Sequence, residues 1–161
     1  MHLFCFGVGY VAKQLSEYLV DQNIQCKISG TSRSPEVKSE IVPPTVRLYD
    51  FASLKMLPQD ITHILSFVPP NQNEVDPVLH RYTHLIAQHT NLNWIGYFSA
   101  TSVYGDHDGA WVNEEAELRA RSPRARSRLQ AEKAWIKLSQ DCNIPLTILR
   151  SSGIYGPGRS P

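Results

Sequence analysis

The chain has 161 residues, which is enough for one domain with a buried core. Its 16 lysines and arginines nearly balance 15 aspartates and glutamates, which excludes the strong basic excess of a dedicated nucleic-acid-binding protein. No apolar run approaches the ~20 residues that a membrane span needs, so we expect residues 1–161 to form one domain that binds neither nucleic acid nor membrane.

The amino terminus and the cysteines both predict a cytoplasmic protein. Met1 and His2 lead directly into an apolar segment, without the basic region and cleavage site of a signal peptide. The three cysteines are odd in number and lack Cys-x-x-Cys spacing, so reduced thiols are the simplest interpretation.

Apolar segments in the first half of the chain alternate between strand and helix patterns. Short apolar runs predict four strands, at residues 2–6, 24–30, 45–49 and 61–68. A helix is predicted over residues 11–22, because its apolar positions recur with helical spacing and share one face: Val11, Leu15, Tyr18 and Leu19. The polar stretch before the third strand, with three prolines, predicts no element.

The same alternation continues in the second half. A helix is predicted over residues 75–90, where Pro77 is compatible only with the first turn. A strand at 91–100, a helix at 126–140 and a strand at 144–150 follow. Strands that alternate with helices across short loops predict βαβ units and a parallel sheet with right-handed crossovers. The predicted fold class is therefore α/β.

The segment Gly7-Val8-Gly9-Tyr10-Val11-Ala12 directly follows the first strand and opens the first helix. Gly7 permits a tight turn, and Gly9 lets the backbone approach a pyrophosphate at the helix amino terminus. Ala12 supplies the small side chain that close packing of helix on strand needs. Gly-x-Gly-x-x-Ala alone is weak evidence, but its place between a strand and a helix predicts a dinucleotide site.

The end of the second strand predicts which dinucleotide binds. An NAD site usually places an Asp or Glu there for the ribose 2′-hydroxyl, but no carboxylate occurs before Glu36. Arg33, with the hydroxyls of Thr31 and Ser32, is suited to a 2′-phosphate. We therefore predict NADP, with NAD as a possibility, and the alternative is that Arg33 is a surface residue in a polar loop.

Further cofactor contacts are predicted after the other strands. Asp50, with Phe51 beside it, is placed to accept a hydrogen bond from an adenine amino group. Asp50 could equally cap a helix formed by the following segment ASLKML. The remaining predicted cofactor contacts are Tyr10, Val11, Val68 and Pro69.

Together these motifs resemble those of the short-chain dehydrogenase/reductase superfamily, in its extended or atypical NAD-dependent epimerase/dehydratase branch. The residues that carry the resemblance are FGVGYVA at 6–12, GTSR at 30–33, YD at 49–50, YFSATSVYGD at 97–106, AEKAW at 131–135 and LRSSGIYGPGR at 149–159. The resemblance implies a doubly wound, Rossmann-type sheet with strand order 3-2-1-4-5-6 and NAD(P) at the carboxyl ends of its strands. It also implies a carboxyl-terminal substrate lobe that is largely absent here, so we expect an amino-terminal part of a longer protein or an unusually short family member.

The resemblance further implies a catalytic triad of Ser or Thr, Tyr and Lys, and this chain departs from it at every position. Ala100 stands four residues before Tyr104, where the family has its Ser or Thr, although Ser99, Thr101 and Ser102 flank it. In the sequence that matches Tyr-x-x-x-Lys, Arg124 replaces the tyrosine and Arg128 the lysine.

These replacements have chemical consequences. A guanidinium group does not titrate near neutral pH, so Arg124 cannot replace tyrosine as a general acid–base. It could donate hydrogen bonds to a carbonyl or bind an anion, while Arg128 could donate to ribose hydroxyls. Their spacing places both on one helix face. Thr101 and Tyr104 complete the catalytic candidates, and the alternative is that the arginines form a solvated helix start.

Other polar clusters give weaker signals. His80 and His84 have the spacing of metal ligands, but no third ligand is evident, so a surface helix is favoured and no metal is predicted. His107, between Asp106 and Asp108, could transfer protons or simply form a polar turn.

Two functions from different classes remain open. The first is an NAD(P)-dependent oxidoreductase or epimerase of atypical chemistry, with a small substrate that Arg124 could bind if the substrate is anionic. The second is a non-catalytic NADP(H)-binding sensor or scaffold protein. The replaced triad favours the second function, and the retained VYGD and IYGPGR segments favour the first.

Overall fold

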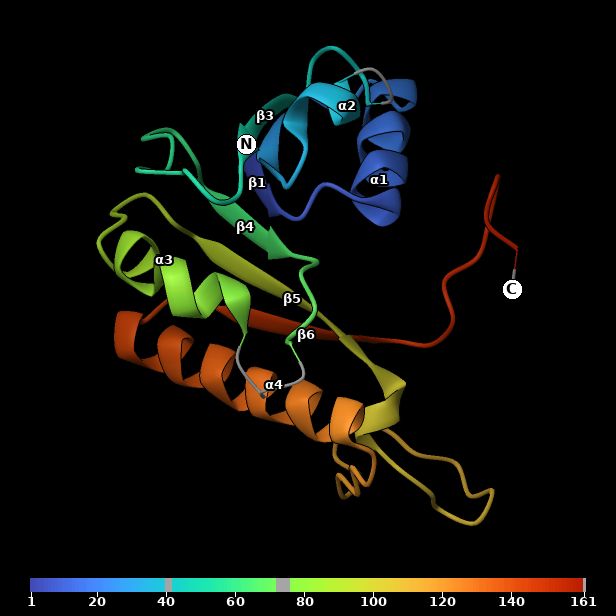
Figure 1. Ribbon diagram of the computed structural model, residues 1–161. Helices are drawn as coiled ribbons and strands as arrows, with labels where there is room; N and C mark the ends of the chain where they lie inside the picture. Colours follow the sequence, from blue (N-terminus) through green and yellow to red (C-terminus); the bar gives the residue numbers. More distant parts are fainter. Residues whose placement is uncertain (40–41, 72–75, 161) are drawn as a thin grey trace.

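The computed structural model, which describes residues 1–39, 42–71 and 76–160, contains a six-stranded sheet (Figure 1). The strands are β1 (His2–Phe6), β2 (Lys27–Ser32), β3 (Arg47–Asp50), β4 (His63–Ser66), β5 (Trp94–Ala100) and β6 (Leu146–Ser151). Every adjacent pair is parallel, and the strand order is β3-β2-β1-β4-β5-β6. The predicted α/β class and the Rossmann-type strand order are confirmed.

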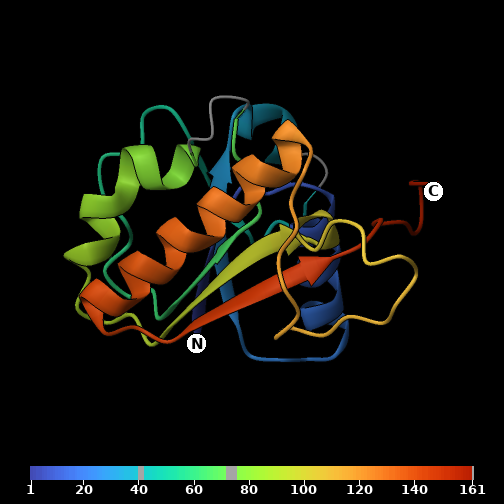
Figure 2. The same cartoon turned by 90° about the horizontal axis from the view of Figure 1, so that it is seen from below.

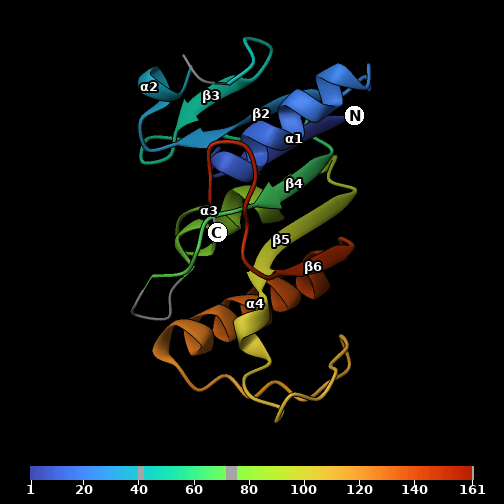
Figure 3. The same ribbon diagram turned by 90° about the vertical axis from the view of Figure 1, so that its right-hand side faces the viewer.

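Helices lie on both faces of this sheet (Figures 2 and 3). They are α1 (Tyr10–Asp21), α2 (Pro35–Ser39), α3 (Pro77–Ala87), the 3₁₀ turn η1 (Thr101–Val103) and α4 (Pro123–Cys142). Helices α3 and α4 lie side by side on one face, and α1 covers the other face near β1 and β2. None of the helices in the described segments is long and apolar enough to cross a membrane.

The residues of β1 point alternately into two apolar cores. Phe4 and Phe6 pack beneath α3 and α4 around the fully buried Trp135. Leu3 and Cys5 pack with Ala12 beneath α1. A parallel strand that is buried on both faces reads as a continuous apolar run, which is why the sequence predicted β1 with its observed bounds.

The predicted apolar face of α1 is partly wrong. Ala12 and Ser16 are the buried positions of this helix, whereas the side chain of Tyr18 is 57% exposed. Close approach of the helix to the sheet requires small side chains at the contact. Leu15 and Leu19 are half-buried and pack against the core beneath α1, and Val11 is also half-buried.

Capping residues fix where α3 and α4 begin. Asp76 caps α3 by accepting hydrogen bonds from the N–H groups of its first turn, and Pro77 lies in that turn, as predicted, as the first residue of the helix. The predicted start of this helix at Val75 lies outside the described residues. Ser122 caps α4 by accepting from the N–H of Ala125, with Pro123 first, so α4 begins three residues before the predicted start.

Two local predictions after β2 and β3 failed. The short helix α2 forms in a stretch for which no element was predicted. The helix predicted for the segment ASLKML is absent from the described residues, and the chain turns there instead. The Asp50 carboxylate accepts from the N–H of Ala52 and the hydroxyl of Ser53, which closes a local turn that competes with a helix.

Candidate functional site

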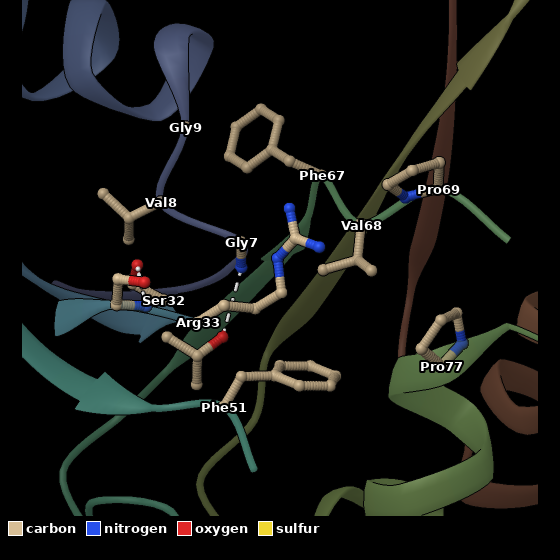
Figure 4. Close-up of a pocket in the computed structure, with 12 residues that line it drawn as sticks. Gly7, Val8, Gly9, Ser32, Arg33, Phe51, Phe67, Val68, Pro69 and Pro77 are labelled. Atoms are coloured by element: carbon tan, nitrogen blue, oxygen red, sulfur yellow. Dashed lines mark hydrogen bonds between the residues drawn. The ribbon is translucent and has the colours of Figure 1, made fainter. Parts of the chain in front are cut away.

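A cavity of about 530 Å³ opens at the carboxyl ends of the strands, where the order reverses between β1 and β4 (Figure 4). Open α/β sheets bind ligands at this switch point. The carboxyl end of β2 and the segments that follow β1, β2, β3 and β4 line it: Gly7, Val8, Gly9, Thr31, Ser32, Arg33, Ser34, Phe51, Phe67, Val68 and Pro69, with Pro77 from α3.

The glycine turn, defined here as Gly7–Gly9, forms the wall of the cavity that joins β1 to α1. Gly7 has φ of +83°, a left-handed conformation that favours glycine, and a Cβ there would lie 2.9 Å from Val68 Cγ2. Gly9 differs, because a Cβ at this position would meet no atom within 4 Å. The space beside Gly9 is therefore open to a ligand that approaches the backbone closely.

Backbone donors at the start of α1 follow Gly9 directly in the chain. A helix cannot satisfy its own first N–H groups, and here these belong to residues that include Tyr10 and Val11. Gly9 occupies the capping position and has no side chain to accept from them. The positive end of the helix dipole adds to their attraction for an anion. These residues fit the diphosphate of a dinucleotide, which would occupy the space that a Cβ of Gly9 would fill.

The side chain of Thr31 holds the glycine turn from the end of β2. Its hydroxyl accepts from the N–H of Gly7 at 3.2 Å (dashed line from Gly7 in Figure 4). Its carbonyl accepts from the N–H of Val8 at 2.8 Å. Thr31 is fully buried, so its hydroxyl serves the turn rather than the open cavity.

Arg33 is the charged residue at the cavity. Its side chain is exposed, and Figure 4 shows its guanidinium group reaching across the opening toward Phe67 and Val68. None of the described residues that line the cavity is acidic. Asp50 does not line it, although the adjacent Phe51 does, because the Asp50 carboxylate is used in the turn at residues 50–53. The hydrogen bond from Ser53 also lowers the pKa of Asp50.

Most predicted cofactor residues come together at this cavity, but Tyr10, Val11 and Asp50 do not line it. Tyr10 borders a second cavity on the other side of Gly9. Its hydroxyl donates to the carbonyl of Pro157 at 3.2 Å, and the Arg159 guanidinium lies over its ring. The carboxyl-terminal turn thus packs against the first residue of α1.

None of the predicted catalytic residues lines the cavity. The guanidinium of Arg128 is half-buried and donates to the Tyr97 hydroxyl at 3.1 Å and the Phe98 carbonyl at 2.9 Å. These contacts tie α4 to the end of β5. The side chain of Arg124, one helical turn earlier, is exposed.

The hydroxyls that flank Ala100 have different environments. Ser99 is buried and donates to the Glu132 carboxylate, whereas Thr101 and Ser102 are exposed. The Tyr104 hydroxyl accepts from Arg150 at 3.1 Å, and the Arg150 guanidinium also lies over the Tyr104 ring. Ser99 and Tyr104 are therefore bound into a network of protein groups.

The histidines lie where the structural alternatives place them, in a polar turn for His107 and on the surface of a helix for His80 and His84. His107 Nε2 lies 3.1 Å from the carbonyls of Tyr104 and Glu117, and Asp106 accepts from the N–H of Asp108 to form a turn. His80 and His84 are exposed on α3. No three potential metal ligands gather within the parts of the chain that the structure describes.

Four residues that line the cavity were not among the predicted cofactor contacts. Val8 and Ser34 are neighbours of predicted residues, and Phe67 directly precedes the predicted Val68. Pro77 is recognisable only as the start of the helix that follows β4. The place of the first three residues, near the carboxyl end of a strand, was the available signal that they line the cavity. Pro77 could be predicted to line it only from the packing of α3 against the sheet.

Comparison with known proteins supports the dinucleotide interpretation. A family model described as the NAD-dependent epimerase/dehydratase family matches residues 7–161. No curated protein sequence matches the chain. Among solved structures, a conserved protein of unknown function from Silicibacter pomeroyi DSS is 38% identical, with a TM-score of 0.87 over 99% of this chain and 56% of that one.

Two similar structures contain NAD. UDP-glucuronic acid 4-epimerase from Bacillus cereus is 20% identical, with a TM-score of 0.75 over 97% of this chain and 58% of that one. dTDP-glucose 4,6-dehydratase from Bacillus anthracis is 18% identical, with a TM-score of 0.75 over 100% of this chain and 57% of that one. At these identities the likeness concerns the fold, and the chain spans little more than half the length of each.

Proposed function

The chain belongs to the NAD-dependent epimerase/dehydratase family, and we propose that it binds NADP(H) in preference to NAD(H) in the cavity beside the glycine turn. In this proposal the first N–H groups of α1, at Tyr10 and Val11, hold the diphosphate. Phe51, Val68 and Pro69 supply apolar walls. Residues 1–161 then form the cofactor-binding domain.

The observation that carries the NADP preference is the chemistry of the β2 end. Arg33 lines the cavity and no described lining residue is acidic. A carboxylate at this place would accept from a ribose 2′-hydroxyl and repel a 2′-phosphate. A guanidinium instead pairs with phosphate through fixed, charge-assisted hydrogen bonds. Ser32 lies beside it, and its hydroxyl accepts from the N–H of Ser34.

For activity, we propose an atypical oxidoreductase or epimerase in which Ala100, Arg124 and Arg128 take the places of the family triad. A nicotinamide cofactor, when bound, would supply or accept the hydride. The exposed Arg124 would hold an anionic group of a small substrate, with Thr101 and Tyr104 as the candidate hydroxyls. Two of the similar structures that contain NAD are named for nucleotide-sugar substrates, so this class is the first to test.

A specific observation favours the second candidate, a non-catalytic NADP(H)-binding sensor or scaffold. The Arg128 guanidinium is used in contacts with Tyr97 and Phe98, and an arginine does not release its proton near neutral pH. The position that matches the family lysine therefore serves the packing of α4 on β5. Consumption of NADPH with a carbonyl substrate would establish an oxidoreductase, and conversion of a nucleotide sugar into its epimer, with no net loss of cofactor, would establish an epimerase. Tight binding with neither reaction would favour the sensor or scaffold.

The binding proposal is tested by filling the space beside Gly9. We expect NADPH to bind the unmodified protein in a fluorescence titration, and Gly9→Val to abolish binding while the fold persists, because the added side chain enters open space. Gly153→Val is the matched control, since a Cβ at Gly153 also meets no atom within 4 Å. Failure of the unmodified protein to bind NADPH or NADH would contradict the proposal.

A further inference from the structure

Thr31 connects two parts of the cavity wall, one proposed to contact the diphosphate of the cofactor and the other its 2′-phosphate. It belongs to the carboxyl end of β2, and its side chain is 0% exposed although the residue lines the cavity. The glycine turn lies on one side of it. Arg33 follows two residues later. A single residue thus joins the segment proposed for the diphosphate to the segment proposed for the 2′-phosphate.

The N–H groups of the glycine turn are all used within the protein. Gly7 donates to the Thr31 hydroxyl, Val8 donates to the Thr31 carbonyl at 2.8 Å, and Gly9 donates to the Gly7 carbonyl at 2.9 Å. These groups therefore set the shape of the turn and leave ligand binding to the donors at the start of α1. Two of the three bonds end on Thr31.

Glycine makes the turn dependent on such contacts. The left-handed Gly7 and the unhindered Gly9 have wide conformational freedom, which must be lost before a ligand can bind a fixed turn. Threonine is suited to fix them, because its branched Cβ restricts the side-chain rotamers and holds the hydroxyl in one direction. The carbonyl of Ser32, in turn, accepts from the N–H of Phe51 at 2.8 Å, which anchors the end of β2 to β3.

We propose that Thr31 is a positioning residue: its hydroxyl fixes the glycine turn for the diphosphate and takes no part in the choice between NADP and NAD. This inference rests on the proposed function and assigns Thr31 a role different from that of Arg33. Because NADPH and NADH share the diphosphate, loss of the hydroxyl weakens both equally. Loss of Arg33 weakens NADPH alone.

The test compares Thr31→Val, which keeps the shape and removes the hydroxyl, with Thr31→Ser, which keeps the hydroxyl. We expect Thr31→Val to weaken NADPH and NADH by the same factor, on the order of tenfold, as loss of an acceptor for a buried N–H predicts. Thr31→Ser should restore most of the affinity. Ser29→Ala is the matched control, because it removes another buried hydroxyl of β2, bonded to His2, away from the turn.

A readout without cofactor keeps the inference separate from the proposed function. In the unmodified protein, hydrogen exchange of the Gly7 amide should be slow, and it should quicken in Thr31→Val but not in Thr31→Ser or Ser29→Ala. This result would support the contact even if no nicotinamide cofactor bound. A fast Gly7 amide in the unmodified folded protein would overturn the inference, whether or not the valine variant folds. So would a loss of affinity in Thr31→Val that is confined to NADPH.

Discussion

The Glu132 carboxylate and the Arg150 guanidinium form a buried ion pair between α4 and β6, with Oε2 2.9 Å from Nη2. Glu132 is 1% exposed, and its other oxygen accepts from Arg150 Nε and from the Ser99 hydroxyl. Both carboxylate oxygens are therefore satisfied. The pair ties α4 to the two strands nearest that edge of the sheet, and it holds the segment that carries Tyr104 through Arg150.

We expect Glu132→Ala to lower the free energy of unfolding by about 3 kcal/mol, because it removes the carboxylate partner of the Arg150 guanidinium, whose side chain is only 16% exposed. Urea unfolding followed by circular dichroism measures this change. Glu115→Ala is the control, since that side chain is exposed, and it should change the stability by no more than about 0.5 kcal/mol. Equal, small effects in both variants would show that the pair does not stabilise the fold.

Two buried serines at the ends of neighbouring strands should respond oppositely to substitution. Ser66 Oγ has no hydrogen-bond partner among residues 1–39, 42–71 and 76–160, whereas Ser99 donates to Glu132. Ser66→Ala should leave the stability unchanged or raise it by up to about 1 kcal/mol, and Ser99→Ala should lower it by about 1–3 kcal/mol. Denaturation midpoints of the two variants decide this, and a larger loss for Ser66→Ala would be incompatible with its environment.

Arg124 and Arg128 should differ when the same substitution is made at each. Arg128→Lys loses the Nη1 amino group that donates to both Tyr97 and Phe98, so we expect it to cost about 1–3 kcal/mol of stability. Arg124→Lys changes an exposed side chain and should cost at most about 0.5 kcal/mol. Thermal unfolding of both variants provides the measurement. The reverse order would mean that Arg124, rather than Arg128, supports the start of α4.

Stability should fall in mild acid because of His2. Burial holds the pKa of His2 below its ordinary value of 6.5, although Asp60, 3.0 Å from Nδ1, opposes this effect. The unfolded chain therefore binds a proton that the folded protein resists, and stability declines as the pH falls through 6.5 toward the lower folded pKa. Lys27 lowers the pKa of Asp60 to about 2, so that carboxylate stays charged in this range.

The measurement is the urea midpoint at several values from about pH 8 to about pH 5, for the unmodified protein and His2→Gln. Glutamine retains a polar side chain beside Ser29 but cannot titrate. The other histidines are common to both proteins, so the difference between the curves isolates His2. We expect a flatter curve for His2→Gln, and superimposable curves would show that His2 does not contribute to the acid sensitivity.

Local patterns predicted most of the fold. Apolar runs located all six strands, because parallel strands buried on both faces leave little ambiguity, and the glycine turn located the amino end of α1. The errors arose where contacts of individual residues override the local sequence pattern. Asp50 closes a turn where a helix was expected, and Tyr18 points outward because α1 approaches the sheet through small residues.

The cofactor end of the candidate site was more predictable than its catalytic end. Residues that directly follow parallel strands meet at one edge of a sheet, because the backbone topology alone places them there. The sequence could therefore predict that Gly7, Arg33 and Val68 line one cavity. The contacts of Arg128 with Phe98 and of Tyr104 with Arg150 depend on side-chain directions between distant elements. Spacing along one helix does not determine them.

The ratio of the NADPH and NADH dissociation constants tests the central proposal most directly. Isothermal titration of the unmodified protein should show tighter binding of NADPH. Arg33→Ala should lose about 1.5–3 kcal/mol of NADPH binding, as expected for a charge-assisted hydrogen bond, and leave NADH affinity unchanged. Arg81→Ala, an exposed arginine on α3, should change neither. Equal affinities for NADPH and NADH in the unmodified protein, or a preference that survives Arg33→Ala, would contradict the proposal.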